Sequence, residues 1–171
     1  MDSSMAFSAL DGVPMGTRPG RLDPGVILHL VRAGWTAEQL ERLLYRESGL
    51  KALSGLSSDM RELERSDHPR ARFAIEYFVH RIAMEMGALG AVLGGVDGIV
   101  FTGGIGENSA LVRGLVCRRA AWLGVRLDEA ANAGGRAIIS EADSSVPVYV
   151  VPTDEELMIA RQTFALIGSG P

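Results

Sequence analysis

A glycine-rich segment in the middle of the chain has the composition of a ligand-binding loop. The apolar residues 97–101 (DGIVF) lead into residues 102–109 (TGGIGENS), after which a helical pattern begins. Glycine lets the backbone approach a ligand closely, and the unpaired amide groups at the start of a helix attract anions. The pattern predicts a strand, a glycine loop and a helix that hold an anionic or nucleotide ligand. The alternative is ordinary turn chemistry, for which glycines between a strand and a helix are common.

Two charged residues stand where they are able to do chemistry. Arg18 lies between glycines in residues 15–20 (MGTRPG), where its guanidinium can reach outward to a planar anion; the alternative is a plain surface arginine. Glu155 opens the last helical pattern, where Thr153 and Glu156 have capping-box spacing, so Glu155 is not needed for the cap. Its carboxylate either complements the helix dipole or binds Mg²⁺, directly or through water.

Asp59 ends a stretch rich in serine and glycine, residues 49–61, which reads as a loop. The spacing from Asp59 to Glu62 allows Asp59 to cap a short helix, and capping alone would explain this residue. The histidines fit no catalytic pattern and are predicted to be structural or surface residues: His29, His68 and His80.

Composition narrows the class of protein. A chain of 171 residues with 47% hydrophobic and 22% charged residues suits one globular domain with a proper core. The net charge is −4 and the 17 basic residues are scattered among 21 acidic ones, so no nucleic-acid partner is expected. Residues 86–96 form the longest apolar stretch, about half of the roughly twenty residues that span a bilayer. No membrane contact is expected.

The start of the chain and its cysteine content indicate a compartment. The first residues lack the basic region and apolar core of a signal peptide. Cys117 is the single cysteine of the sequence and cannot form an internal disulfide bond. Both observations favour a cytoplasmic location.

The expected elements alternate between strands and helices, which makes the class α/β. Strands are predicted within residues 5–10, 97–101 and 146–151, and residues 12–24 read as a structured loop. Helices are predicted around residues 26–31, around 36–40 with a Thr36 and Gln39 capping box, from Arg70 to a stop at Gly94, from 112 to a stop at Gly124, and after Thr153.

Two of these helices carry explicit predictions about their faces. In the helix that stops at Gly124, apolar spacing puts three arginines on the solvated side: Arg113, Arg118 and Arg119. In the last helix, the same spacing predicts a buried side: Leu157, Ala160, Phe164 and Ile167.

Four segments in fixed order carry a resemblance to the C-terminal part of acetate kinases. They are residues 15–18 (MGTR), 54–61 (SGLSSDMR), 101–109 (FTGGIGENS) and 152–161 (PTDEELMIAR). The resemblance covers nearly the whole chain, and four long motifs in order are far more specific than one glycine loop. It implies a ribonuclease-H-like domain of the actin and sugar-kinase superfamily, with a mixed sheet flanked by helices. Residues 1–171 would form the nucleotide-binding and dimerisation domain, with the N-terminal domain absent.

The resemblance also implies an activity and a role for each matching residue. Acetate kinases transfer the γ-phosphoryl group of ATP reversibly to acetate, giving acetyl phosphate and ADP. Arg18 would be a catalytic arginine that stabilises the transferring phosphoryl group, and Glu155 would help to hold Mg²⁺, or Mn²⁺ in its place. The nucleotide would lie against Asp59, Met60, Arg61, Gly103, Gly104, Ile105, Gly106, Glu107 and Asn108.

Several alternatives remain open at this stage. Further catalytic groups of the family belong to an N-terminal domain, so the 171 residues alone are expected to have little or no kinase activity. The chain is then either a fragment of a full acetate kinase or a naturally truncated module that binds nucleotide or pairs with a full-length kinase. Propionate or butyrate kinase is another possibility, since the acyl pocket would come largely from the other domain. A homodimer is expected from the resemblance. Pro19 and Arg21 depart from the family pattern beside Arg18.

Overall fold

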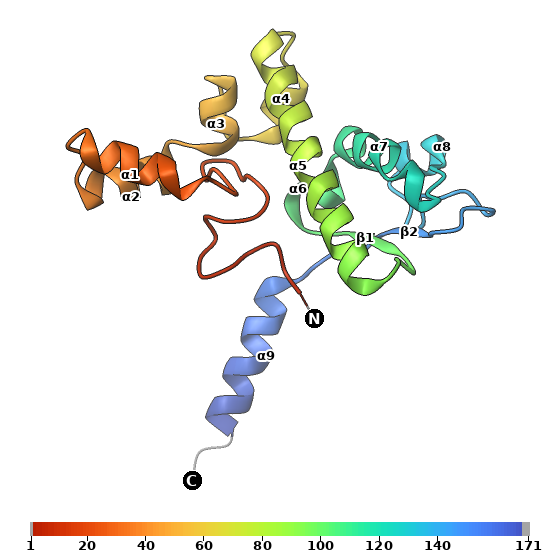
Figure 1. Cartoon of the computed structure of the whole chain (residues 1–171). Coiled ribbons are helices and arrows are strands. Elements are labelled where there is room, and N and C mark those ends of the chain that lie inside the picture. Colours follow the sequence, from red (N-terminus) through yellow and green to blue (C-terminus); the bar gives the residue numbers. More distant parts are fainter. Residues whose placement is uncertain (1, 169–171) are drawn as a thin grey trace.

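The computed structural model describes residues 2–168, without the side chain of Glu155. One long helix runs through the middle of the molecule, and a small sheet lies to one side of it (Figure 1). The elements are α1 (Pro24–Arg32), α2 (Ala37–Arg46), α3 (Gly49–Ser54), α4 (Met60–Glu64), α5 (Pro69–Leu93), β1 (Ile99–Phe101), α6 (Gly103–Asn108), α7 (Ala110–Arg119), the 3₁₀ helix η1 (Ala121–Leu123), α8 (Glu129–Ala133), β2 (Val148–Val150) and α9 (Glu155–Gly168).

The sheet confirms the α/β class in a reduced form. Strands β1 and β2 are parallel, with Ile99 opposite Val148 and Phe101 opposite Val150. An isolated antiparallel bridge joins Ile138 to Tyr149 of β2, so the antiparallel part of the predicted mixed sheet consists of single bridges among the described residues. Parallel strands need a long connection, and here the crossover carries α6, α7, η1 and α8.

The strand predicted within residues 5–10 is wrong, because this segment is irregular and turned. Ser8 Oγ accepts a hydrogen bond from the Leu10 amide and Asp11 Oδ1 accepts one from the Gly12 amide. Such local side-chain bonds compete with strand pairing. The side chain of Phe7 is fully exposed.

Helix starts and stops follow local sequence signals. Asp23 caps α1, and Thr36 with Gln39 forms the predicted capping box of α2. His68 caps α5 through its imidazole, which gives this histidine a structural role, and Gly94 ends α5 in the left-handed conformation. These contacts lie within one turn of the chain, so short patterns are sufficient to specify them.

The predicted loop over residues 49–61 is helical in its first half, as α3. Three carbonyl groups of the distant turn at residues 15–17 accept hydrogen bonds from backbone amides at the start of this helix: Thr17 from Ser48, Met15 from Leu50 and Gly16 from Lys51. Tertiary partners for the free amide groups therefore start a helix that serine and glycine would not favour alone.

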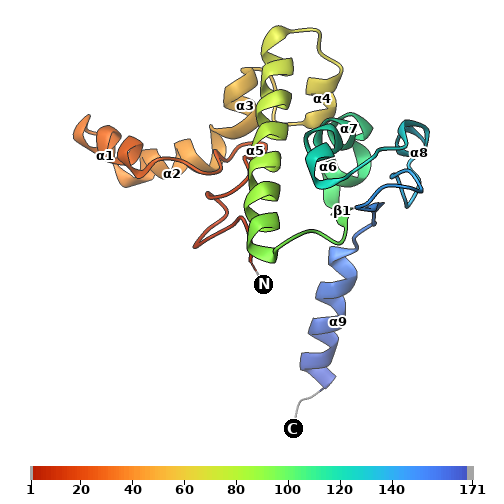
Figure 2. The ribbon, with the colours of Figure 1, turned by 45° about the vertical axis from the view of Figure 1, so that its right-hand side comes forward.

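The core forms two clusters. In the first, Ala71, Ile75 and Phe78 of α5 pack with residues of α3, α4 and α7. The second cluster joins the end of α7 to β1, β2 and the segment around Ile139. Figure 2 shows α5 standing between α3 and the layer that holds α6, α7 and β1.

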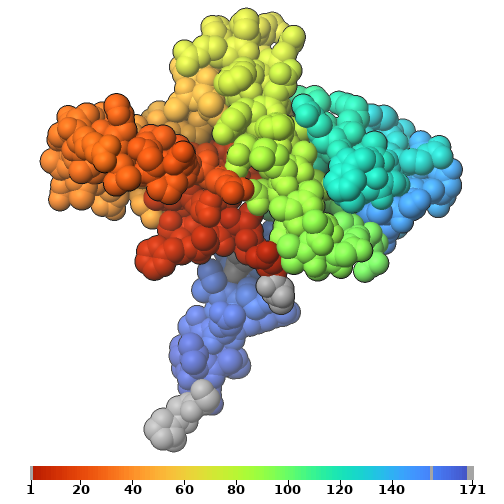
Figure 3. Space-filling view, viewed as in Figure 1, coloured from red at the N-terminus to blue at the C-terminus, as the bar shows by residue number. Residues whose placement is uncertain are grey.

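Helix α9 projects from the rest of the molecule, as the ribbon and the space-filling view both show (Figures 1 and 3). The face predicted to be buried is exposed: Leu157 at 44%, Phe164 at 79% and Ile167 at 76%. The spacing of apolar residues identifies an apolar face but not what covers it, so the prediction that this face of α9 is buried is wrong for the described residues. No helix within residues 2–168 has the length and apolar character to cross a membrane.

Candidate functional site

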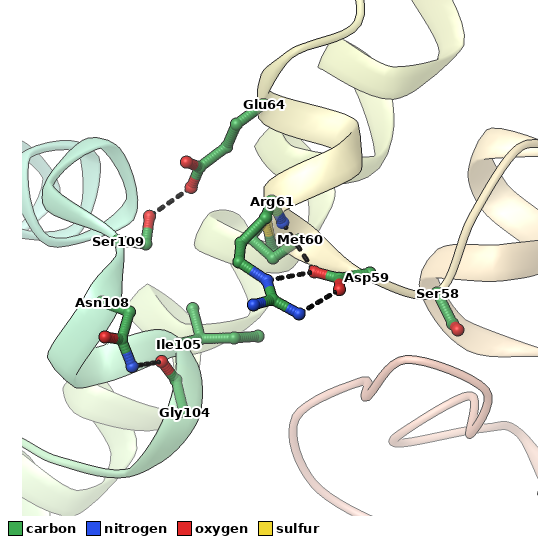
Figure 4. A pocket seen from close by; sticks show the side chains of 9 residues that line it. All are labelled: Ser58, Asp59, Met60, Arg61, Glu64, Gly104, Ile105, Asn108 and Ser109. Carbon is green, nitrogen blue, oxygen red and sulfur yellow. Dashed lines mark hydrogen bonds and ion pairs between the residues drawn. The ribbon is translucent and has the colours of Figure 1, made fainter.

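A cleft with a volume of about 620 Å³ separates α4 from α6. Residues from the two predicted nucleotide segments face each other across it (Figure 4). The cleft is lined by Ser58, Asp59, Met60, Arg61, Glu64, Gly104, Ile105, Asn108 and Ser109. Volumes of this size suit a ligand as large as a nucleoside.

The α4 wall carries a paired carboxylate and guanidinium. Asp59 caps α4 by accepting a hydrogen bond from the Arg61 amide at 2.9 Å, as its spacing predicts. The Arg61 side chain folds back onto the same carboxylate, with Nη2 to Oδ2 at 2.6 Å and Nε to Oδ1 at 3.1 Å. These bonds hold the pKa of Asp59 below its ordinary value and raise the pKa of Arg61, so the two charges persist together at neutral pH. The guanidinium plane is exposed.

The α6 wall is the predicted glycine loop, which the structure shows as a short helix. Gly103 has φ +70°, a conformation that favours glycine, and a Cβ on Gly103 or Gly104 would meet no atom within 4 Å. Gly106 lies against Phe101, where a Cβ would be 3.4 Å from the backbone. Gly104 therefore leaves open space on the cleft side, while Gly106 allows α6 to lie close to β1.

A hydrogen bond joins the two walls of the cleft. The buried Ser109 donates from Oγ to the Glu64 carboxylate. Ser109 Oγ also accepts a hydrogen bond from the Val112 amide at 2.9 Å and so caps α7. The sequence singled out neither Glu64 nor Ser109 as a lining residue, since their contact spans 45 residues.

Glu107 is bound by groups of the protein itself. Its Oε1 accepts hydrogen bonds from the Gly103 amide at 2.8 Å and from the Thr153 amide and hydroxyl, each at 3.0 Å. These bonds, led by that from the Thr153 amide, lower the pKa of Glu107. The Gly103 amide, which was expected to face a ligand, is thereby directed to Glu107.

The capping of α9 also differs from the prediction. Asp154 Oδ1 accepts a hydrogen bond from the Leu157 amide at 2.8 Å, whereas the Thr153 hydroxyl donates to Glu107. Asp154 therefore takes the capping role that Thr153 was expected to have. The stronger charged acceptor at Glu107 explains the difference.

A second hollow of about 460 Å³ lies next to the cleft and shares Gly104 with it. Its lining is Gly103, Gly104, Glu107, Thr153, Asp154 and Glu156. The side chain of Glu155, the predicted metal ligand, lies outside the described part of the structure, and the described residues hold no cluster of three metal-binding side chains. The oxygen donors at this hollow nevertheless suit Mg²⁺, which binds few carboxylates and keeps several waters.

Arg113 is buried, which contradicts its predicted place on the solvated side of α7. Its side chain is 2% exposed and contacts both α6 and α8. Arg118 and Arg119 are exposed, as predicted. A signal was present in the sequence, because Cys117 follows Arg113 by one helical turn and is itself buried in the core.

Arg18 does not line the α4–α6 cleft. Its guanidinium lies 5.5 Å from the centre of the Tyr45 ring and lines a separate hollow against α2. The backbone of its turn is nevertheless close to the cleft, since a Cβ on Gly16 would lie 2.9 Å from the Ser58 carbonyl oxygen. Among the described residues, the Arg18 side chain thus lines a different hollow from the residues predicted to bind nucleotide.

Comparison with known proteins identifies relatives over nearly the whole chain. The sequence profile of the Acetokinase family matches residues 1–161. Acetate kinase of Nitrobacter hamburgensis is 53% identical over 168 residues, which are 98% of this chain and 42% of that protein. Acetate kinase of Methylocella silvestris is 58% identical over 166 residues, which are 96% of this chain and 41% of that protein.

Solved structures similar to this chain are kinases of the same kind. Porphyromonas gingivalis acetate kinase matches with a TM-score of 0.87 and 41% identity, over 96% of this chain and 43% of that one. A propionate kinase from Francisella tularensis matches with a TM-score of 0.88 and 36% identity, over 95% of this chain and 43% of that one. The fold is therefore one that acetate and propionate kinases share.

The chain itself belongs to the acetokinase family, a family of phosphotransferases. It spans about two fifths of the length of the curated relatives that it matches.

Proposed function

We propose that residues 1–171 form the nucleotide-binding and dimerisation domain of an acetate kinase, and that the α4–α6 cleft binds the adenosine of ATP or ADP. The observation that carries this proposal is the pairing of residues 59–61 with residues 104–108 across one cleft. Two sequence segments about forty residues apart supply its opposite walls, in a chain whose family is established independently.

The cleft offers three kinds of contact to a purine nucleoside. Ile105 contributes an apolar surface, and the exposed Arg61 guanidinium is a flat cation able to stack on an aromatic ring. Asp59 supplies a carboxylate acceptor, and its bonds to Arg61 hold its pKa below the ordinary value. Gly104 leaves room for the ligand to approach the α6 backbone.

The phosphates would extend from the cleft toward the neighbouring hollow, which shares Gly104 with it. Glu155 would help to hold Mg²⁺ there, or Mn²⁺ in its place, and the ion would neutralise charge on the nucleotide phosphates. Arg18 would stabilise the transferring phosphoryl group, a role that requires its guanidinium to leave Tyr45.

Acetate is the proposed acceptor, and acetyl phosphate with ADP the proposed products. The curated relatives at 53% and 58% identity are acetate kinases, so the propionate or butyrate alternative is not favoured. A homodimer remains part of the proposal.

A second candidate is a module that binds nucleotide without catalysis. The separation of Arg18 from the cleft favours it for the 171 residues taken alone, because phosphoryl transfer depends on placing such a cation at the reacting group.

Calorimetry and an acetyl-phosphate assay on the same 171-residue preparation test both candidates. We expect binding of Mg-ATP and Mg-ADP, with little or no acetyl phosphate formed from ATP and acetate. Robust turnover would reject the non-catalytic candidate, whereas absence of nucleotide binding by the folded chain would reject the proposed cleft.

A further inference from the structure

We infer that Arg113 is a positioning residue that holds α6 in the geometry needed to face the nucleotide. The inference rests on the proposed nucleotide cleft. It starts from the unusual burial of this arginine, whose side chain is 2% exposed although arginine is seldom fully buried.

Helix α6 needs support from outside itself. Residues 103–108 contain three glycines, and glycine favours a helix less than alanine does. A helix of six residues is also far too short to be stable by its own hydrogen bonds. The conformation of this wall must therefore come from tertiary contacts.

Arg113 supplies those contacts at the carbonyl end of α6. Its Nη1 donates to the Gly106 carbonyl at 3.0 Å and to the Glu107 carbonyl at 2.7 Å. The preceding carbonyl groups have other donors, since Asn108 Nδ2 binds Gly104 and the Ser109 amide binds Ile105. Arg113 thus supplies a donor to two of the carbonyl groups that a helix end leaves unsatisfied.

The other edge of the guanidinium is fixed to α8. Arg113 Nε donates to Asn132 Oδ1 at 2.8 Å and Nη2 donates to the Asn132 carbonyl at 2.9 Å. Asn132 is itself buried and donates from Nδ2 to the Ala110 carbonyl at 2.9 Å. Arg113 therefore joins α6 to α8, which Asn132 in turn bonds to the start of α7.

The chemistry of the partners argues against a purely space-filling role. The acceptors of Arg113 are carbonyl and amide oxygens, so the buried cation gains no ion pair from them. Burial accordingly lowers the pKa of Arg113. A buried charge is costly, and an apolar side chain would fill the space at lower cost. What only the guanidinium provides is simultaneous bonding to α6 and α8.

The test compares Arg113→Met and Arg113→Lys with Arg118→Met, an exposed arginine on the same helix that serves as control. Two readouts are measured on each folded variant: the Kd of Mg-ADP by calorimetry and amide hydrogen exchange of residues 103–109. We expect Arg113→Met to weaken binding by about 10-fold to 100-fold, as small displacements in a site do, and to speed exchange in α6. Arg118→Met should change neither.

Arg113→Lys keeps the charge but cannot bond α6 and α8 at once, so we expect values of both readouts between those of wild type and Arg113→Met. If Arg113→Met does not fold, Arg113→Lys takes its place in the comparison. Wild-type affinity in a folded Arg113 variant, or unchanged exchange in α6, would overturn the inference. Absence of Mg-ADP binding by the unsubstituted chain would reject the proposed function instead. In that case the exchange comparison still decides whether Arg113 holds α6.

Discussion

Thr153 donates two hydrogen bonds to one oxygen of Glu107, from its amide and from its hydroxyl, each at 3.0 Å. This contact joins α6 to the turn that begins α9, across 46 residues of sequence. Since Glu155 is only two residues beyond Thr153, the same contact sets where the proposed metal ligand leaves the body of the protein. Glu107, which lines the neighbouring hollow, thus ties α6 to the start of α9 beside the cleft.

Glu107→Gln should weaken this junction. The neutral amide accepts hydrogen bonds less strongly than a carboxylate, so we expect faster exchange at the Gly103 and Thr153 amides and a roughly 2-fold to 5-fold loss of Mg-ADP affinity. Hydrogen exchange and calorimetry measure the two effects. Glu129→Gln, at an exposed carboxylate on α8, is the control and should change neither. Equal exchange in both variants would show that the Glu107 charge does not matter.

The two adjacent glycines of α6 should respond differently to alanine. Gly104 has open space and no left-handed φ, so Gly104→Ala should maintain or raise the melting temperature while its methyl group obstructs the cleft and weakens nucleotide binding. Gly103 has φ +70°, so Gly103→Ala should cost about 1–3 kcal/mol of stability. Thermal unfolding and calorimetry on both variants check this. Tighter binding by Gly104→Ala would contradict the ligand position proposed here.

Arg61→Ala should weaken adenosine binding by roughly 3-fold to 10-fold through loss of the stacking cation. Arg119→Ala is the control on an exposed part of α7. Calorimetry with adenosine itself, which carries no phosphate, isolates this contact. An equal loss in both variants would point to general electrostatic attraction instead.

The Asp59 and Arg61 pair also predicts a pH dependence. In the folded state, the bonds to Arg61 lower the pKa of Asp59 below its ordinary 3.8. The ion pair therefore stabilises the folded state fully above pH 3.8, and this stabilisation is lost as the pH falls through the pKa of the folded state. Adenosine affinity should therefore be flat between about pH 5 and pH 8. A titration step within that window, retained in Asp59→Asn, would assign it to another group.

Cys117 should be inert to thiol reagents in the folded protein. It is 2% exposed, and burial raises its pKa from 9.0 to about 11. The unfolded chain loses the thiol proton first, so the free energy of unfolding should fall between pH 9 and pH 11, by at most about 3 kcal/mol. Denaturant titrations of wild type and Cys117→Ala measure the difference in slope. Rapid labelling at pH 8 without denaturant would contradict the buried state.

Local patterns in the sequence were sufficient for several elements of the fold. The capping box of Thr36 and Gln39, the cap at Asp59 and the stop at Gly94 each depend on groups within one helical turn, and each is confirmed. Residues of the two segments predicted to bind nucleotide line one cleft, and their binding of a nucleotide stays a prediction.

Features that depend on distant contacts were missed. The burial of Arg113 needs Asn132, and the helical form of α6 needs Arg113, whereas periodicity alone placed that arginine in solvent. The exposed face of α9 shows the opposite error, since Leu157 and Phe164 have core spacing without a surface to cover them within the described residues. The strand expected within residues 5–10 likewise lacks a partner among the described strands.

Amide chemical shifts on titration with Mg-ADP measure residue by residue where a nucleotide binds. We predict saturable shifts at residues 59–61 and 103–108, with smaller changes near Thr153. Shifts confined to the hollow beside Arg18 and Tyr45, or no saturable shifts in the folded chain, would contradict the proposed cleft.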